Sequence, residues 1–265
     1  MFVPMPIKMD VNSVFTDVLG LLHPLSHKSV LIVSGLKGIK APPLYKRCFI
    51  IQSSHNFTMA SQIAHIVYAQ KYFDAYAPKF NPGEFLLGSI FPDIRRIAPQ
   101  LKRRDTHMIL ETLNLDLEYL DSFHAGWKFH LYCDMRREEV LNRAGFYEIE
   151  GAGDHDGLAA KLLEDELVYG QYAKWAELAK FLNKVPRIET GINVSRETFE
   201  LWYAMIAKYV EQKPDNLTRS AFVAKQPSLT DRGAEIIAAV DKIRKSDRVV
   251  KLLADVPEKM INGQQ

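Results

Sequence analysis

From Thr58 to the end of the chain, apolar residues recur at three- and four-residue steps, and this spacing restricts the fold to packed helices. The first stripe predicts a helix from Met59 to about Ala77, capped by Thr58. Its members are Ile63, Ile66, Val67, Tyr72, Phe73 and Tyr76. No segment after Thr58 alternates in a way that predicts a strand. The sequence therefore predicts an all-α, multi-helix fold.

Turn and capping residues divide this part of the chain into further helices. We expect a turn over 81–83, a short helix over 84–90, and a break at Pro92 that places Asp93 in a loop or at a new helix start. A cap at Asp105 or Thr106 predicts a helix with His107 in its first turn. That helix should continue to about residue 139, bent near Gly126. After an irregular segment over 145–157, helices are expected over 158–183 (with a break at Gly170 as an alternative), 196–212, 217–225, 231–245 and 247–254.

The first 58 residues differ in composition from the rest. They hold six basic and two acidic residues and five prolines, and the first glutamate of the chain is Glu84. Two short apolar runs, over 30–33 and 48–51, could form strands packed on the main body. We favour instead an irregular N-terminal extension over 1–58 followed by an all-α metal-binding domain over 59–265, with Met59 as a possible true start.

Composition narrows the function classes. A formal net charge of +2 gives no argument for nucleic-acid binding. Cys48 and Cys133 form neither a disulfide framework nor a CxxC metal pair. No apolar run approaches the ~20 residues of a membrane span, and the amino terminus lacks the layout of a secretory signal. We therefore expect a cytoplasmic protein.

One stretch, from Phe123 to Asp134, suggests chemistry. His130 and Asp134 are four residues apart in a predicted helix, so both side chains project from one face. An imidazole and a carboxylate that converge in this way can share a divalent metal. An isolated pair of this kind is more often a surface hydrogen bond, so the interpretation depends on the residues upstream.

Three upstream residues supply further ligand types for zinc, manganese or iron. His65 lies beside the first apolar stripe, and Asp93 follows a proline-broken helix. About 20 residues lie between His107 and His130, enough for two antiparallel or sharply bent helical arms that return to one centre. Each also has a structural alternative. His65 could be a hydrogen-bonded core histidine, Asp93 a helix cap, and His107 a surface residue.

The order and spacing of these residues resemble the zinc-dependent phospholipase C family, which is related to the zinc-dependent single-strand-specific nucleases. The resemblance rests on Ala64-His65-Ile66, on the Gly-x-x-x-Pro-Asp segment that ends at Asp93, on His107 fourteen residues later, and on Gly126-x-x-x-His130-x-x-x-Asp134. It covers about residues 59–136. The resemblance implies a helical bundle around a metal cleft, with zinc held by His65, Asp93, His107, His130 and Asp134.

The chain departs from the family pattern in three places. It lacks the amino-terminal tryptophan ligand, the next histidine after Asp134 is His155, and the position four residues later is Ala159 instead of an acid. Glu164 or Asp165 could substitute for that acid. We therefore expect one or two ions rather than three.

The expected activity is hydrolysis of a small phosphoester or lipid head group by a metal-activated water. Asp93 and Asp134 are the candidate catalytic carboxylates, able to orient or deprotonate the water. Nearby arginines could clamp a phosphate, although a solvated basic face explains them equally well. They are Arg95, Arg96, Arg103 and Arg104.

Two other classes of protein remain open. One is a helical phosphohydrolase built on an adjacent His-Asp pair, here His155-Asp156, although the surrounding glycines suggest a loop, which is a poor platform for a metal. The other is a non-catalytic helical protein with a structural metal or none. Metal analysis followed by a phosphoester screen separates this last class from an enzyme, and replacing His155 and His130 in turn, then measuring bound metal, separates the two metal sites.

Overall fold

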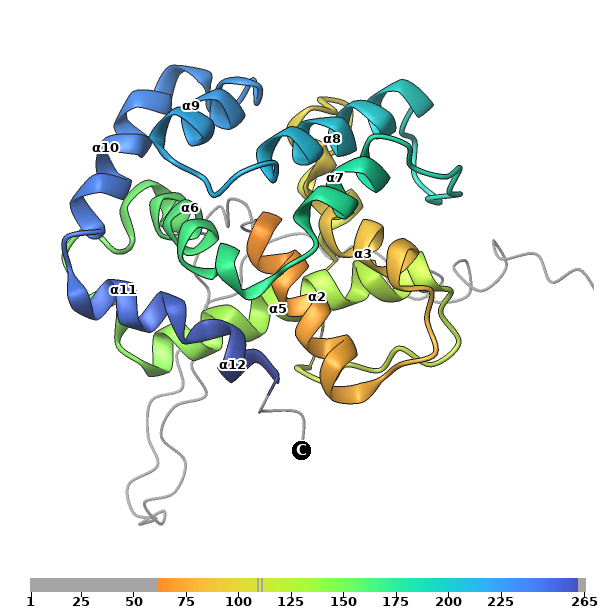
Figure 1. Cartoon of the computed structure of the whole chain (residues 1–265), viewed down its shortest axis with the longest axis horizontal. Helices are drawn as coiled ribbons and strands as arrows, with labels where there is room; N and C mark the ends of the chain where they lie inside the picture. The colour runs from red at the N-terminus through yellow and green to blue at the C-terminus, as the bar shows by residue number, and fades with distance from the viewer. Residues whose placement is uncertain (1–61, 109, 111, 262–265) are drawn as a thin grey trace, which may run out of the picture. The chain divides into compact units, whose positions relative to one another are not determined.

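The computed structural model describes residues 62–108, 110 and 112–261. These residues form α-helices and 3-10 helices joined by loops, and no strand occurs among them (Figure 1). The all-α prediction is therefore confirmed for this part of the chain. The expected extension over 1–58, its two apolar runs, the Thr58 cap and Met59 lie outside the described residues.

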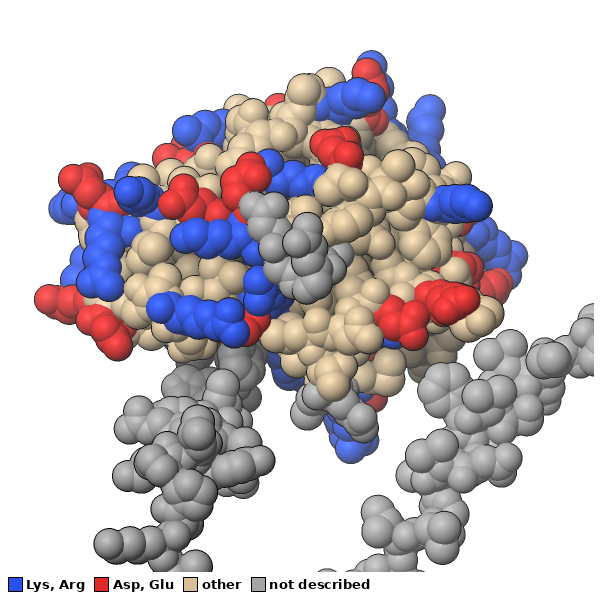
Figure 2. All heavy atoms as spheres, turned by 90° about the horizontal axis from the view of Figure 1, so that it is seen from below, with Lys and Arg blue, Asp and Glu red and all other residues tan. Residues whose placement is uncertain are grey.

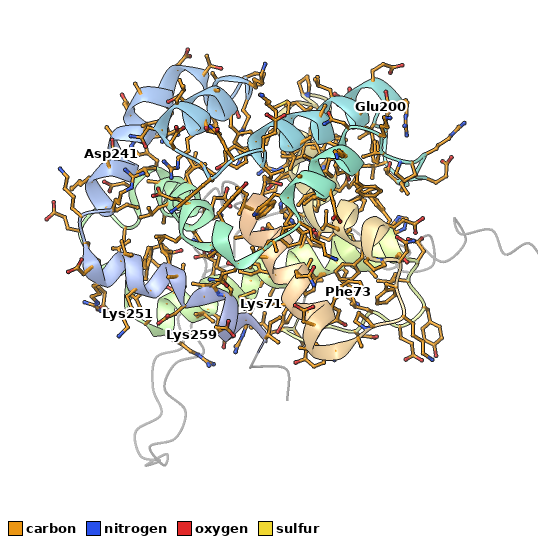
Figure 3. The ribbon with its side chains drawn as sticks, viewed as in Figure 1. Lys71, Phe73, Glu200, Asp241, Lys251 and Lys259 are labelled. Atoms are coloured by element: carbon orange, nitrogen blue, oxygen red, sulfur yellow. The ribbon has the colours of Figure 1, made fainter. Side chains whose placement is uncertain are left out.

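Helix α2 (Gln62–Tyr76) runs through the middle of the described helices (Figure 1). Residues 62–69 are all buried, so its first two turns belong to the core. Helix α12 (Val256–Ile261), which the sequence analysis did not anticipate, packs against α2 near the labelled Lys71 and Lys259 (Figure 3). The contact includes an ion pair of 2.5 Å between Lys71 Nζ and Glu258 Oε1.

Helices α3 (Pro82–Ile90) and α5 (Ser122–Arg143) cross at van der Waals distance between their backbones. A Cβ atom added to Gly88 would lie 1.9 Å from the Phe123 carbonyl oxygen, and one added to Gly126 would lie 1.9 Å from the Phe85 carbonyl oxygen. Only glycine allows this approach, because any side chain at either position would overlap the other backbone. The crossing places the first half of α5 directly beside α3.

The turn expected over 81–83 is the beginning of α3. The Asn81 side chain accepts a hydrogen bond of 3.0 Å from the Glu84 amide, and Pro82 occupies the first helical position. After Ile90 the chain continues as the 3-10 helix η1 (Phe91–Arg96), so Asp93 lies in a short helix.

One helix prediction is wrong. Helix α4 (Arg103–Thr106) is a single turn, His107 is its C-cap, and the described residues over 107–121 contain no helix. Leucines at two-residue steps in this segment, including Leu115 and Leu117, pack against the core from a non-helical chain. The long helix starts only at α5, where Asp121 accepts a hydrogen bond of 2.9 Å from the His124 amide.

The C-terminal half forms a second group of helices. Helix α6 (Leu158–Val168) and helix α7 (Trp175–Leu182) are separated by the 3-10 helix η4 (Tyr169–Gln171), so the predicted alternative of a break at Gly170 is confirmed. Helix α8 (Arg196–Tyr209) is capped by Ser195 as expected. The remaining α-helices are α9 (Asn216–Ala224), α10 (Gly233–Ile243) and α11 (Asp247–Ala254).

Charges of both signs are interspersed on the face that Figure 2 shows, with Lys and Arg more frequent on its left side. Within the described part of the chain, every helix is too short or too polar to cross a lipid bilayer.

Candidate metal centre

All five residues of the predicted metal set meet at one place. His65 comes from α2, Asp93 from η1, His107 from the end of α4, and His130 and Asp134 from consecutive turns of α5. Four of them are buried, with exposed fractions of 0 to 8%, whereas the Asp134 side chain is 20% exposed. The site is therefore an interior cluster that reaches solvent through Asp134.

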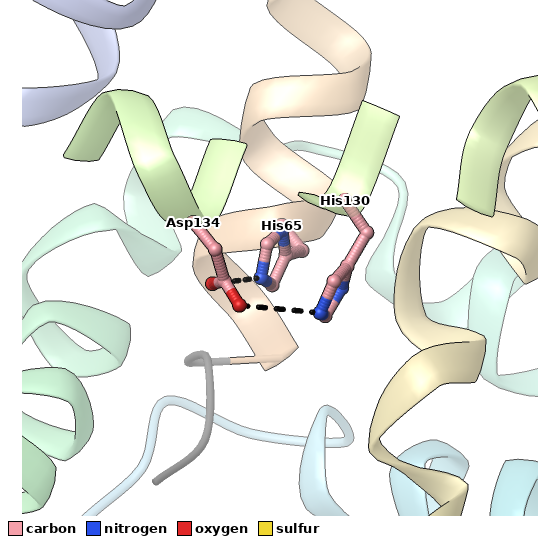
Figure 4. A group of neighbouring side chains, drawn as sticks. All are labelled: His65, His130 and Asp134. Atoms are coloured by element: carbon pink, nitrogen blue, oxygen red, sulfur yellow. Dashed lines mark ion pairs between the residues drawn. The ribbon is translucent and has the colours of Figure 1, made fainter. Parts of the chain in front are cut away.

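Three imidazole nitrogens approach the Asp134 carboxylate. Its Oδ1 lies 3.4 Å from His65 Nε2, and its Oδ2 lies 3.6 Å from His130 Nε2 (Figure 4). His107 Nε2 approaches the same Oδ2 at 3.8 Å and lies 3.4 Å from His130 Nε2. The His65 and His130 rings are stacked with their centroids 4.0 Å apart.

These separations fit a metal ion. Ligands at the usual 2.0–2.2 Å in a tetrahedral arrangement are about 3.4 Å apart. The separations between neighbouring ligand atoms run from 3.4 Å to 3.8 Å. Two overlapping triads have all their donor atoms within 4.8 Å of one another: His65, His130 and Asp134, and Asp93, His107 and His130.

His130 is held in one orientation and one tautomer. Its Nδ1 lies 2.8 Å from the Ser89 carbonyl oxygen, which only accepts hydrogen bonds. Nδ1 therefore carries the proton, and Nε2 of the neutral ring presents its lone pair to the cluster. The close crossing of α3 and α5 makes this contact, because Ser89 follows Gly88 and His130 lies one turn after Gly126.

His107 owes its position to the short helix α4. The His107 amide donates a hydrogen bond of 2.7 Å to the Arg103 carbonyl, and Nδ1 lies 2.8 Å from the Thr106 hydroxyl oxygen. The indole of Trp127, on α5, donates a hydrogen bond of 2.7 Å to the Thr106 carbonyl. A loop histidine is thus tied to the same helix that carries His130.

Asp93 has one satisfied and one unsatisfied oxygen. Its Oδ2 accepts a hydrogen bond of 2.7 Å from the Gln62 side-chain amide. Its Oδ1 is buried, has no hydrogen-bond donor among the described residues, and faces His107 Nε2 at 3.8 Å. A buried carboxylate oxygen without a donor is costly, and a bound cation would offset that cost.

The electrostatics of the cluster favour neutral histidines and charged carboxylates, which are the forms that bind metal. Burial, reinforced by His130, lowers the pKa of His107 to about 3, and burial, reinforced by His65, lowers the pKa of His130 to about 4. Burial alone would raise the pKa of Asp93, but His130 and His107 lower it below its usual value. The same balance, with His130 and His65 as the neighbours, places the pKa of Asp134 well below its usual value.

The two acids suggested as substitutes in the family pattern are engaged elsewhere. Glu164 accepts hydrogen bonds from the Tyr68 hydroxyl and, at 2.7 Å, from Arg137 Nε. Asp165 accepts hydrogen bonds of 3.0 Å from the Ala64 amide and the Tyr209 hydroxyl. Both stabilise the packing of α6, and neither belongs to a metal-compatible group within the described residues.

His155 also lies apart from the cluster. Its Nδ1 is 3.1 Å from Arg232 Nη2, and it belongs to neither triad. The side chain of Asp156 lies outside the described residues.

The sequence analysis missed the residues that support the cluster. Gln62 holds Asp93, and its position three residues before His65 in one helix could have indicated a shared face. The Ser89 carbonyl contact has no sequence signal, because any residue supplies that oxygen. Lys161, on α6, is buried, and its charge acts on Asp134 and Asp93. No motif pointed to this lysine.

No known family model, curated protein or solved structure matches this chain. Within the described residues, the structure itself shows an all-helical fold with buried His and Asp groups that could bind a metal.

Proposed function

We propose that this protein is a metal-dependent hydrolase of phosphoesters, with one divalent ion, zinc in the first instance, held by His65, Asp93, His107, His130 and Asp134. The observation that carries the proposal is the gathering of three imidazoles and two carboxylates from four helical elements into two groups of ligand atoms that share His130. Chance contacts between surface residues do not bring together five such groups with neutral imidazoles and ionised carboxylates, the forms that bind a cation.

One ion suits the cluster better than two. His130 belongs to both triads, and it has a single nitrogen to offer because Nδ1 donates to the Ser89 carbonyl. Two ions would have to divide the remaining four residues around one shared imidazole. A single ion beside His130 Nε2 avoids this division.

The two carboxylates have different parts in the proposed reaction. When bound, the ion would act as a Lewis acid and lower the pKa of a coordinated water towards about 7. Asp93 is fully buried and hydrogen-bonded to Gln62, so it would hold the ion beside His107. Asp134 is the partly exposed member, so it can contact a water molecule from solvent, orient it and accept its proton.

An anionic substrate is supported by the cations around the cluster. Arg96 and Arg103 act electrostatically on both Asp93 and Asp134. Guanidinium groups bind phosphate oxygens through paired hydrogen bonds. The motif resemblance points to the same chemistry, so small phosphoesters and lipid head groups are the substrates to test.

The test is metal content and turnover in matched variants. The purified full chain should contain about one zinc per chain by mass spectrometry of the metal, and should hydrolyse generic phosphoesters. His130→Asn and Asp134→Asn should lose most of the metal and at least about a hundredfold in kcat/KM. His124→Asn, on the same helix but bonded to Asp121, should retain both.

Each of the other outcomes would contradict the proposal in a different way. Stoichiometric zinc without turnover of any phosphoester would assign the cluster a structural role. Loss of metal in His155→Asn, but not in His130→Asn, would instead support the adjacent His-Asp site. No metal in any preparation would remove the hydrolase proposal.

A further inference from the structure

Two cations lie one helical turn from proposed ligands, and a third, buried on α6, acts electrostatically on Asp134 and Asp93. In a 3-10 helix the side chains at i and i+3 eclipse, so Arg96 lies over Asp93 on the same face of η1. On α4, Arg103 precedes His107 by four residues, and its carbonyl accepts the His107 amide hydrogen bond. On α6, Lys161 precedes Asp165 by four residues, on the face that contacts α2. We name Arg96, Arg103 and Lys161 the basic rim.

Arg96 is the most informative member of the rim. Arg96 is only 7% exposed. Its Nε and Nη2 atoms are buried and have no hydrogen-bond partner among the described residues. Burying guanidinium donors without acceptors is unfavourable for folding. The Nε and Nη2 donors of the planar Arg96 guanidinium can therefore bind an acceptor that the described residues do not supply.

The charge count indicates what that acceptor is. The two carboxylates that act on Arg96 and Arg103 are Asp93 and Asp134, and together they balance one divalent ion. With the ion bound, Asp93 and Asp134 would no longer balance the charge of Arg96. A phosphate monoester carries close to two negative charges at neutral pH and three terminal oxygens that accept hydrogen bonds. A diester carries one charge and offers two such oxygens.

We infer that the basic rim binds the phosphoryl group of a phosphomonoester substrate beside the metal cluster, with Arg96 and Arg103 as specificity-determining residues. The inference rests on the proposed function for the reaction, but the binding of phosphate to the rim is independent of turnover. The group recognised is a terminal phosphate, so the leaving part of the substrate extends towards solvent on the side of Asp134.

Binding of inorganic phosphate to the full chain tests the rim directly. Calorimetry on the zinc-loaded protein should show saturable binding, weakened about tenfold to a hundredfold in Arg96→Gln and in Arg103→Gln. Arg104→Gln is the matched control. It removes a neighbouring arginine of α4 whose side chain is 79% exposed, and it should change the affinity less than twofold.

A stability measurement shows whether Arg96→Gln is still folded, so that weaker phosphate binding is not mistaken for a folding defect. Because the variant removes buried donors that lack partners, its thermal midpoint without phosphate should equal or exceed that of the parent protein. Added phosphate should raise the midpoint of the parent and of Arg104→Gln, but not that of Arg96→Gln. Wild-type phosphate affinity in both Arg96→Gln and Arg103→Gln would overturn the inference.

Turnover separates the inference from the proposed function. The protein should hydrolyse p-nitrophenyl phosphate with at least tenfold higher kcat/KM than bis(p-nitrophenyl) phosphate, and Arg96→Gln should abolish this preference. Equal or better turnover of the diester would overturn the rim assignment and leave the hydrolase intact. Rim-dependent phosphate binding without hydrolysis of either ester would support the rim and defeat the hydrolase.

Discussion

His130 has both ring nitrogens assigned, one to the Ser89 carbonyl and one to the metal cluster. This arrangement distinguishes it from His124, six residues earlier in α5, whose ring pairs with Asp121 near the surface. The difference lies in the neighbours of each ring, because both histidines belong to the same helix. A hydrogen bond on Nδ1 and converging acids at Nε2 are what make a histidine a credible ligand.

Glu164 shows the opposite case, a buried acid committed to stability. It is fully buried and neutralises Arg137, itself only 4% exposed. We expect Glu164→Gln to lower the free energy of unfolding by about 3 kcal/mol, because it leaves a buried guanidinium without its main counter-charge. Chemical denaturation measures the loss. Zinc content should stay at the wild-type level, and loss of zinc in a folded variant would place Glu164 among the ligands after all.

The histidine pKa values predict how the metal-free protein responds to acid. The pKa values of His107 and His130, lowered by burial to about 3 and about 4, lie below the value of about 6.5 in an unfolded chain. Between pH 6.5 and 4 the unfolded state therefore binds more protons, so stability falls as the pH is lowered. Each histidine should contribute a slope of about 1.4 kcal/mol per pH unit in this window.

Urea unfolding in the presence of a chelator, repeated across this pH range, measures that slope. His130→Asn should remove the contribution of one histidine, and a slope unchanged in the variant would contradict the assignment. The carboxylates Asp93 and Asp134 act in a separate window, because their lowered pKa values make them lose stabilisation only at lower pH.

At the scale of elements, the crossing of α3 and α5 positions the site. We expect Gly126→Ala to destabilise the protein by about 3 kcal/mol or more, because the added Cβ would lie 1.9 Å from the Phe85 carbonyl oxygen and force the helices apart. It should also weaken metal binding, since the same displacement moves His130 away from Ser89. Thermal or urea denaturation and metal titration measure both effects.

Gly233→Ala, at the start of α10, is the control for that substitution. Its added Cβ would meet Val223 Cγ1 at 3.6 Å, an ordinary contact, so the helix should be unchanged or slightly more stable. Equal stability of Gly126→Ala and Gly233→Ala would show that the crossing tolerates a side chain.

Periodicity and caps predicted most of the elements, and motif spacing selected the five residues that meet. His65, Asp93, His107, His130 and Asp134 could be chosen because ligand types at fixed intervals carry chemical information in the sequence itself. The prediction of one helix over about 107–139 is wrong because the same apolar residues fit both a continuous helix and a one-turn helix followed by a loop. The supporting contacts depend on backbone atoms and on tertiary packing, which residue types do not encode.

At the scale of the whole molecule, the proposed ion would link segments that are distant in sequence. His65 lies on the central helix, whereas the other four ligands lie within residues 93–134. Binding to the native state alone stabilises it by about 4 kcal/mol when free metal exceeds the dissociation constant a thousandfold. We therefore expect chelation to lower the melting temperature by about 8–16 °C.

Differential scanning calorimetry with and without chelator measures this shift, and added zinc should reverse it. His130→Asn should show no response to either treatment. A chelator-sensitive melting temperature that persists in the variant would place the ion elsewhere in the chain.

The glycine crossing also bears on which ions the protein accepts. Two backbones in direct contact have no flexible side chain between them to yield, so the distance from Ser89 to His130 is rigid. Asp134, partly exposed, and His107, at the end of a single helical turn, are the adjustable members. An ion with a larger radius than zinc would have to be accommodated on that side alone, and selectivity among divalent metals would follow from this unequal stiffness.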